Sequence, residues 1–221
     1  MELLATESDF TTSLRKALKE IDLNWESYPG LIIAGSHTPT NIEEKITKIK
    51  EARWNKQPFL GICLGFQLMI IEYARTALGK FKANSTEINP ETNFPVIIKT
   101  NQLRVGMKPT MDLWGNQTME SFWHNYKMNN EYLSQYVDEW KFLQSYDPDL
   151  GEYIIDFLLY KSLTDKNIFF GGCQYHAEYQ SSKQKPHWIL EEFFICIGLI
   201  FNKFLFSSVI CLRLLSCVSF V

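Results

Sequence analysis

Residues 59–74 constrain the fold of this chain most, because an apolar run, a tight turn and a helical pattern follow one another around one cysteine. The run reaches Gly61, and Gly65 stands two positions after Cys63. This order is typical of a nucleophile elbow, in which small residues let strand and helix approach closely. The elbow would hold Cys63 at a helix N-terminus, where unpaired N–H groups and the helix dipole favour the thiolate. The alternative is a buried structural cysteine, the common place for a free thiol.

A second motif, residues 171–179, lies more than a hundred positions downstream and contains a histidine and a carboxylate. Residues 168–170 have the composition of a buried strand, and His176 and Glu178 follow soon after it. A cysteine nucleophile needs a base that takes its proton, and that base needs a carboxylate that fixes its tautomer. A histidine at a strand end is more often a satisfied polar residue, but an elbow requires a partner. Cys63, His176 and Glu178 are therefore the predicted catalytic groups.

The two motifs, residues 61–67 and 174–179, resemble those of the class I glutamine amidotransferases, and in particular the amidotransferase half of CTP synthase. The resemblance covers about residues 2–192. It implies hydrolysis of the side-chain amide of glutamine to glutamate and ammonia through a γ-glutamyl thioester, with no cofactor and no metal ion. The further segments that carry it are 71–75, 83–87, 90–92, 95–97, 103–106, His124, Tyr126 and 129–130.

The same resemblance implies an oxyanion hole made by backbone N–H groups near Gly35 and at Leu64. Losing one donor of such a hole typically raises the barrier by about 3–4 kcal/mol. The family usually has a second glycine and an aromatic residue where this chain has Ser36 and His37. The donors are kept only if the φ angle of Ser36 stays negative, because serine tolerates positive φ poorly. His37 is expected to pack against the substrate rather than to act as a rival base.

The resemblance also implies the substrate contacts. Gln67 would hydrogen-bond the amino-acid end of glutamine, and Glu87 would pair with its α-ammonium, which rejects amides without an amino group. Their simpler interpretation is a helix-surface amide and a loop carboxylate. Trp123 stands where the family has the arginine that receives the α-carboxylate, and such a bidentate contact contributes about 1.5–3 kcal/mol. Weak affinity for glutamine or a different substrate is therefore expected, unless Arg104 compensates from a neighbouring strand.

Length and composition are those of one soluble α/β domain, since 221 residues with 46% hydrophobic content can bury a substantial core. The net charge of −3, without a basic excess, gives no indication of nucleic-acid binding. Five cysteines without CxxC spacing argue against a disulfide framework or a zinc site and favour a reducing, cytoplasmic location. Residues 1–9 are mixed and acidic, unlike a secretory signal.

The order of apolar and helical patterns predicts an α/β fold with a doubly wound, mostly parallel sheet flanked by helices. The active site would lie at the carboxyl ends of its strands. A first helix would be capped by Thr11 or Thr12, and a second would begin with Asn41 and Glu44 as a capping pair. The expected strands of this part of the chain are 3–5, 21–25, 30–35 and 59–61.

The amidotransferase domain is expected over residues 1–200, and residues 201–221 form an apolar tail of unknown status. The uncharged runs of the tail are shorter than the roughly 18 residues of a membrane span, so an anchor is less favoured than a buried or partner-covered extension. The chain has no Gly-X4-Gly-Lys-Ser/Thr loop for ATP. A separate synthetase or another ammonia acceptor is therefore the expected partner, beside glutamine itself.

A second class of function remains open from the sequence. It is a non-catalytic protein of the same fold that binds an amino acid or a partner as a regulator. The complete Cys63, His176 and Glu178 set favours the enzyme, and the replacements at Ser36 and Trp123 favour the regulator.

Overall fold

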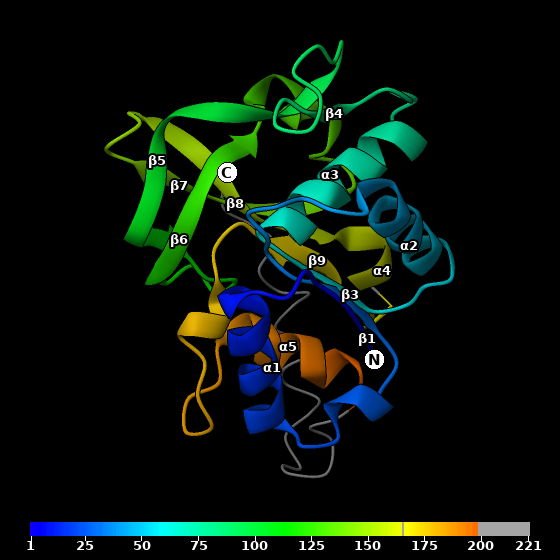
Figure 1. The fold of residues 1–221 in the computed structure, drawn as a ribbon, viewed down its shortest axis with the longest axis vertical. Coiled ribbons are helices and arrows are strands. Elements are labelled where there is room, and N and C mark those ends of the chain that lie inside the picture. The colour runs from blue at the N-terminus through cyan, green and yellow to red at the C-terminus, as the bar shows by residue number, and fades with distance from the viewer. Residues whose placement is uncertain (165, 199–221) are drawn as a thin grey trace.

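The structure of the protein is a computed structural model that describes residues 1–164 and 166–198 (Figure 1). The tail at 201–221 lies outside the described residues. The helices are α1 (Asp9–Ile21), α2 (Ile42–Trp54), α3 (Leu64–Thr76), α4 (Lys161–Thr164) and α5 (Trp188–Cys196), with short 3-10 helices η1 (Trp25–Ser27), η2 (Asn130–Gln135) and η3 (Ala177–Tyr179). No helix in these two ranges is both long enough and apolar enough to cross a membrane.

Within the described residues the central sheet has six strands. Their spatial order is β1 (Glu2–Leu4), β2 (Leu31–Ile33), β3 (Phe59–Ile62), β9 (Phe170–Cys173), β8 (Glu152–Tyr160) and β7 (Trp140–Asp147). The first four are parallel, whereas β8 and β7 run antiparallel at one edge. A second sheet, with β4 (Asn84–Ser85), β5 (Pro95–Met111) and β6 (Gln117–Met128), forms an arm beside the first. The predicted α/β fold is confirmed, with a mixed rather than purely parallel sheet.

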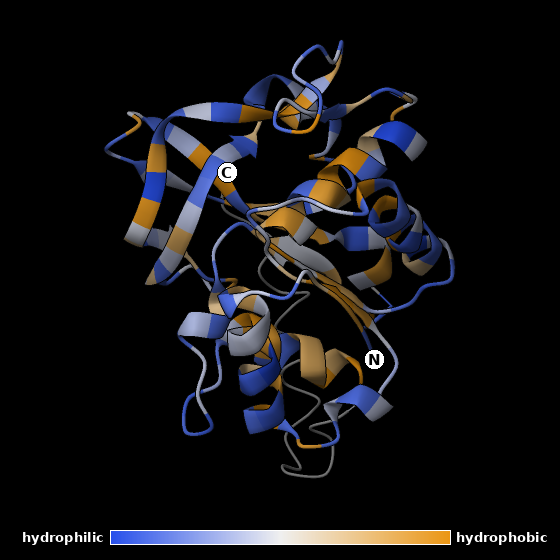
Figure 2. Cartoon of the chain, in the orientation of Figure 1, coloured by the Kyte–Doolittle hydropathy of each residue, from blue (hydrophilic) through white to orange (hydrophobic). Residues whose placement is uncertain are grey.

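Helices cover both faces of the central sheet, α1 and α5 on one side and α2 and α3 on the other (Figure 1). Its central strands are apolar along their whole length, as Figure 2 shows, because parallel strands are buried on both faces. One buried cluster includes Ile49 of α2 and Met69 of α3. The other includes Leu14 of α1 and Phe193 of α5. These two layers hold the carboxyl ends of β2, β3 and β9 in fixed positions.

The expected strand at 21–25 is wrong. Helix α1 continues to Ile21, and Trp25 begins the 3-10 turn η1. The apolar side chains of α1 follow helical spacing as far as Ile21, and Trp25 is buried in the core from the turn. When a turn residue such as Trp25 buries its indole in the core, the sequence shows the same alternation of apolar and polar residues as a short strand. This explains why the pattern predicts a strand here.

The predicted cap of α1 is also wrong, and that of α2 is right in position only. The cap of α1 is Ser8, whose side chain accepts from the N–H of Thr11, while the Thr11 hydroxyl donates to the Thr6 carbonyl. Asn41 does precede α2, but its φ of 51° is left-handed and its side chain makes no capping hydrogen bond. Asparagine tolerates this conformation better than most residues, so its role is to turn the chain.

Candidate active site

Cys63 lies between the end of β3 and the start of α3, and its backbone is strained, with φ 51° and ψ −99°. The flanking glycines are required by space. A Cβ on Gly65 would lie 2.2 Å from the carbonyl oxygen of Ile33, and one on Gly61 would lie 2.6 Å from the backbone of Gly65. Strand and helix therefore approach as closely as the sequence predicts for an elbow. A non-glycine residue with positive φ persists only where its surroundings impose it, commonly at functional sites.

The second motif reaches Cys63 because β9 pairs with β3. Ile62 is opposite Cys173, and the N–H of Cys63 donates to the Cys173 carbonyl at 2.8 Å. Three residues later His176 lies fully buried, and its Nδ1 is 2.7 Å from Oε1 of Glu178, which is also buried. The sheet thus brings the three predicted catalytic groups to its carboxyl edge.

The surroundings of His176 favour its charged form. Burial alone would lower the pKa of His176, but Cys63 and Glu178 outweigh burial and raise the pKa to about 10. Nε2 makes no hydrogen bond to a described residue and is left for a reacting group. Gly35 packs against both partners, since a Cβ there would lie 2.7 Å from Cε1 of His176 and 3.3 Å from Cβ of Cys63.

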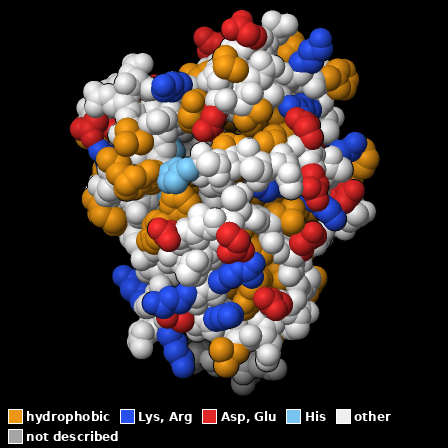
Figure 3. All heavy atoms as spheres, in the orientation of Figure 1, with side chains coloured by type: hydrophobic (Ala, Val, Ile, Leu, Met, Phe, Trp, Pro, Cys, Tyr) orange, Lys and Arg blue, Asp and Glu red, His pale blue; other side chains and the backbone are white. Residues whose placement is uncertain are grey.

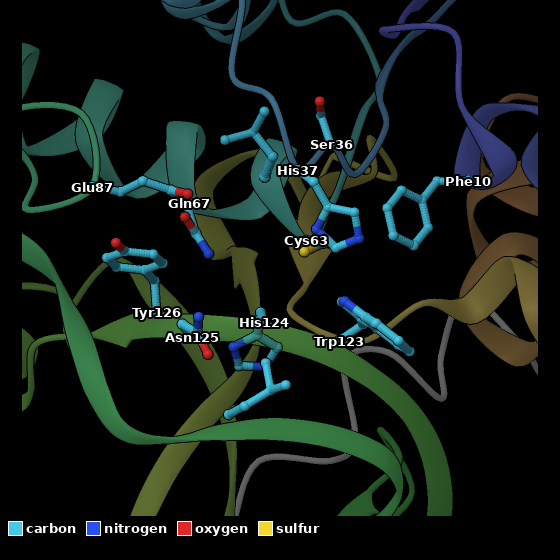
Figure 4. Close-up of a pocket in the computed structure, with 12 residues that line it drawn as sticks. Phe10, Ser36, His37, Cys63, Gln67, Glu87, Trp123, His124, Asn125 and Tyr126 are labelled. Carbon is cyan, nitrogen blue, oxygen red and sulfur yellow. The ribbon is translucent and has the colours of Figure 1, made fainter.

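A cavity of about 190 Å³ opens above the sulfur of Cys63 (Figure 4). It is lined by the predicted residues Cys63, Leu64, Gln67, Glu87 and Trp123, which come from three different segments of the chain. As the first residue of α3, Leu64 has an N–H without an intrahelical partner. The structure therefore brings every predicted substrate residue to one site, with Gly35 behind it.

Ser36 also lines this cavity. It is not among the described non-glycine residues with positive φ, so the condition for keeping its backbone donors is met. Its hydroxyl closes a local turn, because it donates to the Thr38 carbonyl at 3.1 Å and accepts from the Thr38 N–H at 3.2 Å. The turn after β2 therefore tolerates serine without a change of backbone region.

Gln174 is a site residue that sequence reasoning did not assign. Its Nε2 donates to Sγ of Cys63 at 3.6 Å, and its Oε1 accepts from Nε2 of Gln67 at 3.3 Å. Both glutamine side chains are buried. The available signal was its place in the second motif, two positions before His176. A neutral donor beside the sulfur stabilises negative charge there without competing as an acid.

An aromatic wall, which consists of Phe10, His37 and Trp123, forms one side of the cavity (Figure 4). The ring centroids of Phe10 and His37 are 4.6 Å apart, and those of His37 and Trp123 are 6.0 Å apart. Partial burial and then the charge of His176 lower the pKa of His37, so His37 is neutral at neutral pH. No sequence pattern pointed to Phe10, because α1 meets the site only through the tertiary fold.

Arg104 does not compensate for the missing arginine. It belongs to β5 of the second sheet and its side chain is buried, with Nε 2.7 Å from Asp147 and Nη1 2.8 Å from Asp156. Its guanidinium also lies 4.0 Å from the ring centroid of Phe122. Arg104 is not among the residues that line the cavity, so its charge holds β5 to β7 and β8.

The fold is that of a class I glutamine amidotransferase domain. Residues 6–196 match the family described as glutamine amidotransferase class-I, and the chain belongs to this family. Among solved structures, the glutaminase domain of Trypanosoma brucei CTPS with bound acivicin has the same fold, with a TM-score of 0.77 and 17% identity. The match covers 89% of this chain and 92% of that one.

Within the family the chain is similar to CTP synthases, as the sequence motifs indicated. It is 33% identical to the CTP synthase of Clostridium beijerinckii over 195 residues, or 80% of this chain. It is 36% identical to that of Shouchella clausii over 185 residues, or 74% of this chain. These matches span only 34% and 33% of the two relatives, so the chain covers about a third of their length.

Proposed function

We propose that this chain is an amidotransferase domain of CTP synthase type. It hydrolyses a glutamine side-chain amide and passes the ammonia to a separate synthetase or another acceptor. Pyrimidine biosynthesis in the cytoplasm is the setting that the resemblance favours. The observation that supports it most is the convergence of the strained Cys63 with the buried His176–Glu178 pair, whose Nδ1 and Oε1 are 2.7 Å apart.

In this mechanism the Cys63 sulfur attacks the amide carbonyl carbon, and the oxygen takes up negative charge toward the N–H groups of the Ser36 turn and of Leu64. The C–N bond breaks as His176 gives its proton to the leaving ammonia. Water then attacks the thioester while His176 takes a proton from it, and the C–S bond breaks to release the acid. Glu178 holds Nδ1–H throughout and so keeps Nε2 directed at the reacting atoms.

The test is release of glutamate and ammonia by the full-length chain over millimolar glutamine. Cys63→Ala should lower turnover by about a thousandfold or more, because the covalent route is lost. Cys173→Ala is the matched control. Burial raises the pKa of Cys173 well above its usual range, so that thiol is unreactive at neutral pH and the variant should stay active.

A regulatory protein without catalysis is the second candidate, and the absence of lysine and arginine among the described residues that line the cavity favours it. Absence of turnover of any glutamine side-chain amide, together with no labelling of Cys63 by a glutamine-mimicking electrophile, would support that candidate and reject the enzyme. Labelling and turnover that both depend on Cys63 would establish the enzyme.

A further inference from the structure

The charges around the cavity suit an ammonium group but not a carboxylate. Glu87 follows β4 and is the only carboxylate among the described lining residues, and no lysine or arginine is among them. Partial burial of the Glu87 carboxyl raises its pKa, and a cationic partner would offset that cost. Of the other titratable groups at the site, only the histidines could carry a positive charge.

None of these histidines offers a free positive charge. Burial, followed by the charge of Arg104, holds the pKa of His124 well below its usual range, and His37 is also neutral. His176 is charged, but its Nδ1 is bonded to Glu178 and its other side faces Cys63. Free glutamine would therefore find a charged partner for its α-ammonium and no cation for its α-carboxylate among the described lining residues. A carboxylate next to an indole loses part of its hydration and gains no ion pair that would offset this cost.

An exposed apolar strip continues outward from the cavity along the arm. The strip consists of Leu103, Val105 and Met107 of β5 with Met119 and Trp123 of β6, each 41–51% exposed. Val105 and Trp123 are opposite each other across the two strands. Leu103 and Trp123 also line the cavity, so the strip begins at its mouth. Figure 3 shows hydrophobic side chains gathered over this arm, next to a surface histidine.

We propose that the preferred substrate is a peptide that begins with glutamine. Its α-ammonium pairs with Glu87, its first peptide bond lies against Trp123, and the apolar residues that follow lie along the strip. A peptide bond removes the carboxylate charge that the cavity cannot balance, and it continues the chain toward the strip. Figure 4 shows Glu87 and Trp123 on opposite sides of Cys63, which leaves the sulfur between the two anchoring points.

This inference rests on the proposed function, because the same Cys63 chemistry acts on the side-chain amide. Ammonia leaves with a proton from His176, a C–S bond replaces the C–N bond, and water then replaces sulfur. The product is the same peptide with glutamate as its first residue. Mass spectrometry distinguishes it from the cyclised peptide that glutamine termini form spontaneously.

The experiment compares kcat/KM of the full-length chain for L-glutamine, L-glutamine α-amide, Gln-Gly-amide and Gln-Leu-amide. We expect the α-amide to exceed glutamine by about tenfold or more, since a carboxylate without a cationic partner is lost. Gln-Leu-amide should exceed Gln-Gly-amide because leucine contacts the strip. N-acetylated Gln-Leu-amide should lose activity, because it has no ammonium for Glu87.

Trp123→Arg should reverse the preference toward free glutamine, and Trp54→Arg is the matched control. Trp54 is 63% exposed on α2 and is not among the lining residues, so the same exchange there should leave the ratio unchanged. Equal or higher kcat/KM for free glutamine in the wild type would overturn the inference while leaving the amidase intact. Inactivity on all four substrates would instead reject the proposed function, and the inference with it.

Discussion

The ring of Phe10 is stacked on the imidazole of His176, with centroids 4.3 Å apart and planes 16° from parallel. The two residues come from α1 and from the segment after β9, and Phe10 is buried. An aromatic face on an imidazolium stabilises its positive charge and fixes the plane of the ring. Phe10 is therefore a positioning residue, because it acts on the substrate through His176.

Phe10→Leu should lower kcat by about tenfold with little change in KM, since the base loses its orientation while the Glu87 side of the cavity is unchanged. It should also move the alkaline limb of the pH profile to lower pH, because the imidazolium loses the aromatic face. Steady-state kinetics over a pH series measures both effects. Phe81→Leu is the control, since Phe81 is exposed. An unchanged pH profile would show that Phe10 only fills space.

The pH dependence of kcat/KM should show an alkaline limb with a pKa of about 10. Cys63 and Glu178 raise the pKa of His176 to this value against the effect of burial. Below it His176 holds the proton that the leaving ammonia needs, and above it the proton is lost and the rate falls. Glu178→Gln should move the limb to lower pH as well as slow turnover. A limb near pH 6.5 in the wild type would contradict the assignment of His176 as the acid.

Gly65→Ala should destabilise the domain by about 3 kcal/mol or more, because overpacking of a rigid contact is not relieved by small shifts. The added methyl would lie 2.2 Å from the Ile33 carbonyl oxygen, which belongs to the backbone of β2. Urea unfolding measures the change. Gly79→Asn is the control, because nothing lies within 4 Å of that Cβ position and asparagine tolerates its φ of 68°. Equal stability of the two variants would contradict close packing at the elbow.

Arg104→Met should cost about 3–5 kcal/mol of unfolding free energy, because it leaves two buried carboxylates without their cation. Asp147 and Asp156 are both almost fully buried, and each receives a hydrogen bond from Arg104. Lys108→Met is the comparison, since its ion pair with the exposed Asp149 should contribute no more than about 1 kcal/mol. Denaturant titration of both variants measures the two losses of unfolding free energy. A loss for Arg104→Met no larger than that for Lys108→Met would show that the buried cluster is not a stabilising element.

Local patterns predicted the parts of the molecule that depend on neighbours in the chain. The elbow follows from Gly61, Cys63 and Gly65, because the glycines that permit close approach lie within two residues of the cysteine. Local patterns were least reliable where a distant contact decides. Residues 21–25 alternate like a strand, yet Trp25 lies in a 3-10 turn and its side chain is buried in the core. Likewise, Ser8 rather than a threonine caps α1.

The sequence by itself determined the α/β class, the two motifs and the amidotransferase resemblance, because short-range spacing and residue chemistry carry that information. Only the tertiary structure decided what surrounds the motifs. It stacked Phe10 on His176 and paired Arg104 with two aspartates. It also lined the cavity with Glu87 and an aromatic wall. Such contacts join residues far apart in the chain, and their geometry depends on how sheets and helices pack. The substrate preference proposed here therefore depends on packing as well as on the catalytic residues.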